Sequence, residues 1–411
     1  MYYYRAWADV DLDALEHNLA QIRSGLPDRT QVMAVVKADA YGHGSIAAAR
    51  HLQDLPGVWG FGVGDSQEAL ELREAGVTSP VLILGAIIED EIARVLANDI
   101  SVSVHSARRA ARLDREAVRL GKRLKVHLMV DTGMGRLGVA SGRALAVARG
   151  IAASPGLEMA GVATHYSSAT GVADPFTMRQ QACFRKVGDE LLRAGIEPGV
   201  FHASNSSAVF SPIGSLQGGH FDVVRPGISL YGINPGETLP VDISLRPVLS
   251  FKTQVVFLKD MPAGTPVGYN RTHVTSGPTR IATIPIGYND GYPFRLSGRG
   301  DVLIRGRRAP VVGTVTMDYT MIDVGRIRGV EVGDLVTLIG GDGEERIAVE
   351  EIARKVGTIP YEIACAIGKR VRRVPRKTQK KRDAGERDPA LDAVRKTRET
   401  VTIPVTVNRE P

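Results

Sequence analysis

The sequence has few cysteines, few aromatic residues and no long apolar segment. Only Cys183 and Cys365 are present among 411 residues, and their wide separation argues against a disulfide framework. No apolar run reaches the roughly 20 residues that a membrane-spanning helix needs. The N-terminus lacks the basic head and apolar stretch of a signal peptide. These absences favour a cytoplasmic protein without a membrane partner.

The net charge of the main part of the chain is also small. The net charge is +7, but residues 376–398 alone carry nine Lys/Arg and four Asp/Glu. The rest is close to balanced, so no basic face for nucleic acid is expected. Residues 377–411 lack apolar periodicity, and we expect a charged, disordered tail there.

Apolar runs and helical patterns alternate through the first half of the chain. A helix capped by Asp11 is expected first, because Leu12, Leu15, Leu19 and Ile22 form one stripe. Eight short apolar runs follow: Val32–Val36, Val58–Val63, Val81–Leu84, Ile100–Val104, Leu124–Val130, Leu157–Ala163, Val200–Ala203 and Phe221–Val224. This order predicts an α/β fold with a (β/α)₈ TIM barrel over residues 11–241. Two doubly wound domains would give the same count, but no Gly-x-Gly-x-x-Gly follows a strand.

A second, mostly β domain is predicted over residues 242–376. Its β-rich pieces run without helices between them: Ser250–Leu258, Thr279–Ile286, Asp301–Ile304, Val311–Val324 and Leu335–Leu338. One helix is expected at about Ala348–Val356. Residues 1–10 alternate aromatic and small side chains, and we expect them to add a strand to this domain.

Lys37 is the most informative residue, because it directly follows the apolar run Val32–Val36. An ammonium at the end of a buried strand is unfavourable unless it has a use. Burial lowers the pKa of a lysine, which makes its amine nucleophilic and able to form a Schiff base. Tyr41 lies in the glycine-containing loop that follows. The alternative is a lysine that only extends its ammonium to solvent.

Polar loops follow the other strands at the same end of the predicted barrel, where catalytic residues of such barrels lie. After strands seven and eight, Asn205, Ser206, Gly227 and Ile228 offer hydroxyl and amide groups to an anion. After strands five and six, the loops carry Arg136, whose guanidinium suits a carboxylate, and His165. Ordinary polar loops and a structural ion pair are the alternatives. We expect no metal site.

Residues from about Arg5 to Arg376 resemble bacterial alanine racemase across both domains. The matching segments are Val32–Gly44, Asp131–Gly138, the His165 turn, Asn205-Ser206, Arg225–Gly232, Gly268-Tyr269, Gly287–Tyr292, Thr316–Asp318 and Pro360–Glu362. The resemblance implies an isomerase that interconverts L-alanine and D-alanine and supplies D-alanine for cell-wall peptidoglycan.

The resemblance also implies pyridoxal phosphate as the cofactor, covalently held by Lys37. The implied phosphate ligands are Tyr41, Ser206, Tyr361 and the amides of Gly227 and Ile228, with Asn205 and His165 as further cofactor-binding residues. Arg225 would face the pyridine nitrogen. A guanidinium cannot accept a proton, so its charge opposes protonation of that nitrogen and weakens the ring as an electron sink.

Racemisation needs a base on each face of the substrate α-carbon. The resemblance implies Lys37 for the D-alanine face and Tyr269 for the L-alanine face. Arg136 and the amide of Met317 would bind the carboxylate of alanine. Tyr288, together with Tyr361, would narrow the entrance.

The same family takes four of these residues from a partner subunit: Tyr269, Tyr288, Met317 and Asp318. A homodimer with shared active sites is therefore implied by the resemblance.

One position departs from the family, which commonly has a carbamylated lysine that supports the strand-five arginine. Met129 stands there, so Arg136 must be oriented in another way. A broad-specificity racemase, a decarboxylase of basic amino acids and a non-catalytic carrier of pyridoxal phosphate remain as alternatives. The tyrosines at 269, 288 and 361 favour a racemase with a small pocket.

Overall fold

A computed structural model describes residues 4–168, 174–210, 221–235 and 244–377 of the chain. The tail predicted over residues 377–411 lies outside this part except for Lys377. Among the described residues, no helix combines the length and apolar character that crossing a bilayer requires.

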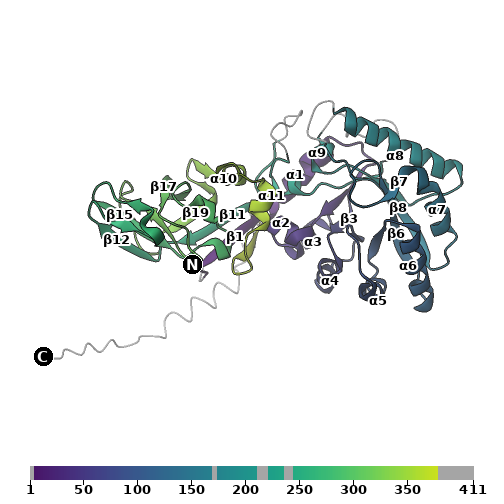
Figure 1. The fold of residues 1–411 in the computed structure, drawn as a ribbon, viewed down its shortest axis with the longest axis horizontal. Helices are drawn as coiled ribbons and strands as arrows, with labels where there is room; N and C mark the ends of the chain where they lie inside the picture. The colour runs from purple at the N-terminus through teal and green to yellow at the C-terminus, as the bar shows by residue number, and fades with distance from the viewer. Residues whose placement is uncertain (1–3, 169–173, 211–220, 236–243, 378–411) are drawn as a thin grey trace, which may run out of the picture. The chain divides into compact units, whose positions relative to one another are not determined.

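Eight parallel strands close into a barrel in the first half of the chain (Figure 1). They are β2 (Gln31–Val35), β3 (Val58–Val63), β4 (Val81–Ile83), β5 (Ser101–Val104), β6 (Leu124–Asp131), β8 (Leu157–Ala163), β9 (Val200–His202) and β10 (Val223–Val224). Pairing of β10 with β2 closes the ring. Met33, Leu82 and Val223 pack together from three of these strands. The predicted barrel is confirmed, strand by strand.

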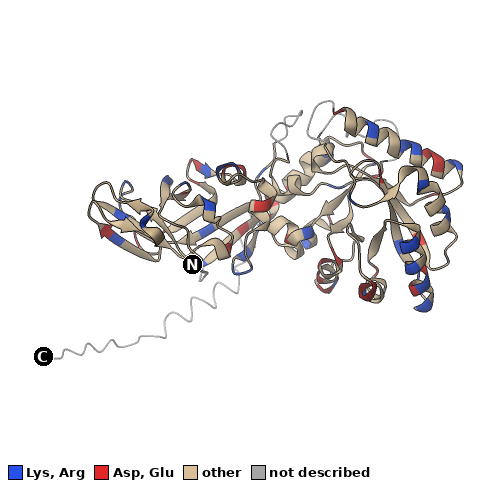
Figure 2. Cartoon of the chain, viewed as in Figure 1, with Lys and Arg blue, Asp and Glu red and all other residues tan. Residues whose placement is uncertain are grey.

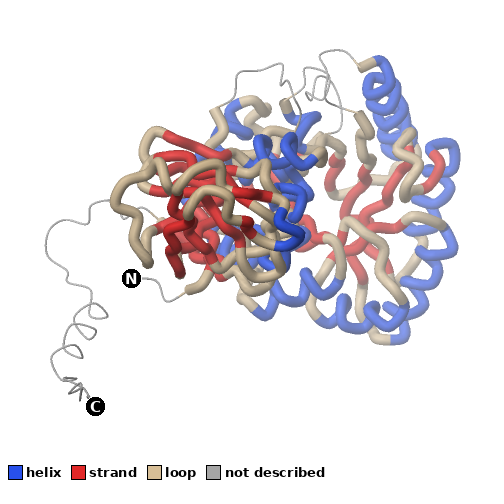
Figure 3. The backbone as a smooth tube through the Cα atoms, turned by 60° about the vertical axis from the view of Figure 1, so that its left-hand side comes forward, coloured by secondary structure: helices blue, strands red, loops and turns tan. Residues whose placement is uncertain are grey.

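Helices surround the barrel strands, as Figure 3 shows. They are α1 (Leu12–Ser24), α3 (Ser45–Leu52), α4 (Ser66–Glu74), α5 (Ile92–Ala97), α6 (Ala107–Arg119), α7 (Ala144–Ala152) and α8 (Pro175–Arg193). Two short elements, α2 (Lys37–Gly42) and α9 (Ser206–Val209), follow β2 and β9 at the carboxyl ends of these strands, and residues 38–41 of α2 are left-handed. Asp11 caps α1 as predicted, because its carboxylate accepts a hydrogen bond from the amide of Ala14 at 2.9 Å. On α6, Ala110, Leu113 and Ala117 are buried, while charged residues of both signs occupy the outer face (Figure 2).

The second half of the chain is mainly β-structure. Its largest sheet has the order β12-β15-β18-β17-β16-β19-β11-β1-β21. The strands are β1 (Ala6–Asp11), β11 (Leu249–Gln254), β12 (Phe257–Met261), β15 (Thr279–Ile284), β16 (Asp301–Ile304), β17 (Arg307–Val312), β18 (Thr320–Asp323), β19 (Leu335–Asp342), β20 (Glu345–Ile347) and β21 (Arg372–Arg376). Two helices follow β20: α10 (Val349–Val356) and α11 (Pro360–Cys365). The N-terminal strand β1 joins this sheet between β11 and β21.

Two of the predicted β-rich segments each contain parts of two strands. Ser250–Leu258 divides into β11 and β12, because the Val255 amide bonds to Asp334 while the Val256 amide bonds to Thr283. The chain thus changes pairing partners at this point. Val311–Val324 divides at Gly313, whose φ of 67° ends β17. The strand β21 was not predicted.

Candidate active site

Lys37 lies two residues after the last residue of β2, at the end of the barrel where the strands have their carboxyl termini. Its side chain is largely buried, and this burial lowers the pKa of the amine below its ordinary value. The nearby positive charges of Arg136 and Arg225 lower it further, whereas Glu68 opposes the shift. The expectation of a lysine with increased nucleophilicity therefore has a physical basis in the structure.

A left-handed turn follows Lys37. Ala38, Asp39, Ala40 and Tyr41 all have φ between 52° and 54°, although none is a glycine. Such a conformation costs about 1–2 kcal/mol per residue for L-amino acids, so other contacts must stabilise it. The turn fixes the direction in which Tyr41 leaves the backbone four residues after Lys37.

Glu68 on α4 holds the start of this turn. Its Oε1 accepts a hydrogen bond from the amide of Ala38 at 2.6 Å, and its Oε2 accepts one from the amide of Gly64 at 2.7 Å. The sequence Asp65-Ser-Gln-Glu68 instead suggests a capping box, in which Glu68 would bond to its own helix terminus. Asp65 does cap α4, but the Glu68 carboxylate bonds to Ala38 and Gly64. Local sequence therefore gave no signal for this role.

One cavity of about 180 Å³ collects most of the predicted site residues. The predicted residues that line it are Lys37, Tyr41, Arg136, His165, Asn205, Ser206, Arg225, Gly227 and Tyr361. Ile228 follows Gly227 and begins the 3-10 turn η3 (Ile228–Tyr231), but it does not line the cavity. Met129 also lines the cavity. Segments far apart in the chain thus meet at the barrel mouth as predicted.

The loops after β9 and β10 form a polar end of this cavity. The hydroxyl oxygen of Ser206 accepts a hydrogen bond from the amide of Gly227 at 2.8 Å. Asn205 fixes the loop, because its side chain accepts from the Ala208 amide at 3.1 Å and donates to the Tyr166 carbonyl at 3.2 Å. A Cβ at position 227 would overlap with the Tyr41 hydroxyl. The Gly227 amide already donates to Ser206, so the hydroxyls of Ser206 and Tyr41 are the donors that converge here, and they fit a phosphate group.

Arg225 is buried at the base of the cavity, where several acceptors hold its guanidinium. Its Nη2 donates to the carbonyls of Thr164 at 2.7 Å and Ala203 at 3.0 Å, and its Nη1 donates to Nδ1 of His202 at 2.8 Å. Burial lowers the pKa of Arg225 to about 10, which still leaves it charged at neutral pH. A fixed cation therefore lies at the base of the cavity.

His165 also interacts with this guanidinium. Its Nδ1 lies 3.3 Å from Nη2 of Arg225, which can only donate. Nδ1 must therefore accept, and the neutral ring carries its proton on Nε2. Burial and the charges of Arg225 and Arg136 lower the pKa of His165 to about 3, so the ring stays neutral.

Four predicted residues do not reach this cavity within the chain. Tyr269, Tyr288 and Met317 lie on the β domain with side chains that are 70%, 46% and 53% exposed. Asp318 forms an ion pair of 2.8 Å with Arg370. The structure of one chain therefore contains the Lys37 part of the predicted site without the Tyr269 part.

Arg136 is exposed at the opening of the cavity. It has no hydrogen-bond partner among the residues that the structure describes. The Met129 thioether lines the same cavity and offers it no charged group. The guanidinium is thus free to bind an anion that enters.

Comparison with known proteins agrees with this geometry. Residues 10–235 match the family model of the alanine racemase N-terminal domain, and residues 248–375 match that of its C-terminal domain. An alanine racemase from Halothermothrix orenii is 41% identical over 369 residues, which are 89% of this chain and 96% of that protein.

Solved structures give the same result. Alanine racemase from Clostridium difficile superposes with a TM-score of 0.86 at 33% identity, covering 92% of this chain and 97% of that one. Alanine racemase from Bartonella henselae with covalently bound pyridoxal phosphate has a TM-score of 0.78 at 28% identity, covering 90% of this chain and 99% of that one. The chain belongs to the alanine racemase family.

Proposed function

We propose that this protein interconverts L-alanine and D-alanine with pyridoxal phosphate bound covalently to Lys37. One observation carries the proposal: a single cavity joins the Lys37 amine, the anion-binding loops at Ser206 and Gly227, and the buried cation Arg225. When bound, pyridoxal phosphate withdraws electrons from an attached amino acid and so acidifies its α-hydrogen.

Two residues of this chain prepare the site for the cofactor. The lowered pKa of Lys37 makes its neutral, nucleophilic form more accessible near neutral pH. The Arg225 guanidinium cannot take up a proton, so it keeps a positive charge beside the ring. That charge disfavours a proton on the ring nitrogen, and proton return to the same carbon is favoured over other outcomes.

Racemisation requires a second base opposite Lys37. Among the described residues of one chain, the cavity contains three further candidates for this base. They are His165, whose Nδ1 already accepts from Arg225, and Tyr41 and Tyr361, which the proposal assigns to the phosphate. The missing base is Tyr269 of a second copy of the chain. Tyr288 and Met317 of the same β domain are also exposed, and exposed apolar side chains on one domain support an interaction surface there. The active enzyme is then a homodimer with shared sites.

His165 would complete this arrangement through its other nitrogen. Because Nδ1 accepts from Arg225, Nε2 carries the proton and can donate to the phenolic oxygen of Tyr269 from the second copy. Such a donor stabilises a phenolate and so helps Tyr269 act as a base.

The substrate carboxylate would be bound by Arg136 and by the backbone amide of Met317 from the second copy. Tyr288 and Tyr361 would narrow the opening and favour a small side chain. The product D-alanine then serves peptidoglycan synthesis.

The experiment is an assay of L-to-D conversion with alanine, serine and lysine, using purified protein and pyridoxal phosphate. We expect conversion of alanine to be fastest, and borohydride treatment followed by mass spectrometry to place the label on Lys37. Equal rates for lysine would point instead to a broad-specificity racemase. A label on another lysine would contradict the assignment of the cofactor site.

A further inference from the structure

His43 holds the carbonyl end of the left-handed turn, and the proposed function assigns this residue no role. Nδ1 of His43 lies 3.0 Å from the carbonyl oxygen of Ala40 and 2.9 Å from that of Tyr41. Carbonyl oxygens only accept, so Nδ1 must carry the proton and donate to both. Glu68 binds the first amide of the turn and His43 binds its last two carbonyls, so side chains hold both ends.

The His43 ring is itself fixed in place. It is fully buried and stacks on Tyr231 with ring centroids 4.6 Å apart. The Tyr231 hydroxyl donates to the carbonyl of Val35 at 3.0 Å, in the strand that leads to Lys37. The His43 ring is therefore tied both to the turn and, through Tyr231, to the end of β2.

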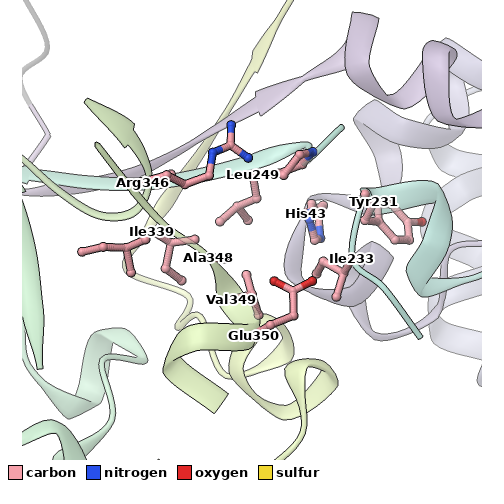
Figure 4. A pocket seen from close by; sticks show the side chains of 13 residues that line it. His43, Tyr231, Ile233, Leu249, Ile339, Arg346, Ala348, Val349 and Glu350 are labelled. Atoms are coloured by element: carbon pink, nitrogen blue, oxygen red, sulfur yellow. The ribbon is translucent and has the colours of Figure 1, made fainter. Parts of the chain in front are cut away.

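The other nitrogen of His43 has no hydrogen-bond partner among the described residues. The ring lines a cavity of about 20 Å³, which is enough for one water molecule, beside apolar side chains such as Ile233, Leu249 and Val349 (Figure 4). Burial lowers the pKa of His43 to about 4, so the ring is neutral in neutral solution. All of the hydrogen bonds that this buried ring makes to described residues go to the turn.

Tyr41 is the residue that this turn presents to the cavity. Its ring is buried, and its hydroxyl oxygen lies only 2.3 Å from where a Cβ of residue 227 would be. A small rotation of the Ala40–Tyr41 peptide would move the phenol away from Gly227 and Ser206. The backbone of the turn prefers another conformation, so the position of the phenol depends on the groups that hold its carbonyls.

We propose that His43 is a positioning residue whose Nδ1–H holds the left-handed turn and thereby places the Tyr41 hydroxyl at the phosphate end of the cofactor site. This inference rests on the proposed function, which assigns that phosphate end to Tyr41, Ser206 and Gly227. If His43 only filled space, the shape of its side chain would matter but its Nδ1–H donor would not.

Three substitutions separate these two roles. His43→Asn keeps an N–H near the position of Nδ1, His43→Leu has nearly the same shape as asparagine but lacks the donor, and His43→Gln places its amide further out. The dissociation constants of pyridoxal phosphate and of pyridoxal are measured on the full-length apoprotein. Thermal unfolding of each variant is recorded in parallel.

We expect His43→Leu and His43→Gln to weaken binding of pyridoxal phosphate at least tenfold and binding of pyridoxal less than threefold. His43→Asn should stay within threefold of wild type for both ligands. In a Tyr41→Phe background, His43→Leu should weaken binding of pyridoxal phosphate by less than threefold more, because the phenol it positions is gone. If His43→Leu does not fold, the comparison of His43→Asn with His43→Gln decides.

Equal binding by the asparagine and glutamine variants would overturn the inference, as would equal losses for pyridoxal phosphate and pyridoxal. Either result leaves the proposed function intact as long as wild-type apoprotein binds pyridoxal phosphate. Wild-type apoprotein that fails to bind it would overturn the proposed function, and the role of His43 with it.

Discussion

Nη1 of Arg225 donates to Nδ1 of His202 at 2.8 Å, and Nε2 of His202 lies 2.8 Å from Nδ1 of His127. The arginine can only donate, so His202 accepts at Nδ1 and carries its proton on Nε2, which donates to His127. Burial and the Arg225 charge lower the pKa of His127 to about 3, so this ring is neutral. Two neutral histidines therefore orient the buried guanidinium from inside the barrel.

Removing the acceptor at His202 should impair catalysis. His202→Phe keeps a ring but leaves Nη1 of Arg225 without this partner in a buried site, which costs about 1–3 kcal/mol. We expect kcat/KM for alanine to fall about tenfold to a hundredfold. His202→Asn offers a carbonyl oxygen near the position of Nδ1 and should lose less. Equal activity of the phenylalanine variant and wild type would show that Arg225 needs no such support.

Gly161 on β8 makes room for the His127 ring. A Cβ there would overlap with Nδ1 of His127. Gly161→Ala should therefore lower the free energy of unfolding by about 1–3 kcal/mol, as overpacked cores do. Gly142→Ala is the matched control, because a Cβ at that position meets nothing within 4 Å. Urea unfolding of the two variants measures the difference, and an unchanged midpoint for Gly161→Ala would contradict the packing described.

The lowered pKa of Lys37 makes stability depend on pH in a defined direction. The folded apoprotein binds this proton less tightly than the unfolded chain, so the buried ammonium destabilises the fold below the folded-state pKa. The penalty fades as pH rises toward 10.5, the ordinary value. Apoprotein with Lys37→Met should thus unfold at higher urea than wild type at pH 7, with a smaller gap at pH 10. A gap that grows with pH would contradict the burial of Lys37.

Because position 129 is a methionine, we predict that racemase activity does not depend on dissolved carbon dioxide. A thioether cannot be carbamylated, and Met129 lines the active-site cavity where the family commonly has a lysine. Racemisation rates in degassed buffer and in buffer with added bicarbonate should therefore agree. Stimulation by bicarbonate would mean that another lysine supports Arg136.

Periodicity and position along the chain predicted much of the fold and which barrel residues would meet in one cavity. The eight apolar runs correspond to the eight barrel strands. Because Lys37, Arg136, Ser206 and Arg225 follow the carboxyl ends of such strands in the sequence, they were expected to lie together at the barrel mouth, and they line one cavity. These predictions succeed because a parallel barrel places all strand ends on one rim.

Other features have no local signal. Alanine and tyrosine rarely adopt a left-handed conformation, and aspartate does so only as a single residue, so the sequence of residues 38–41 does not predict four such residues in a row. The role of Glu68 depends on an amide 30 residues away, and that of His127 depends on tertiary contacts across the barrel. The division of Ser250–Leu258 likewise follows from a change of partner strands that the sequence does not show.

The central claim is that Lys37 and Tyr269 of one site belong to different chains. Lys37→Ala and Tyr269→Phe homodimers should each be nearly inactive. In a mixed dimer, one site carries both lesions, while the other combines the intact Lys37 of one chain with the intact Tyr269 of its partner.

The decisive measurement is the racemase activity of verified heterodimers of these two variants, formed by subunit exchange. Each variant mixed with itself serves as the control. We predict activity up to about half the wild-type value, since one of two sites is restored in a two-fold symmetric dimer. Verified heterodimers that remain as inactive as the two parent variants would contradict the shared site.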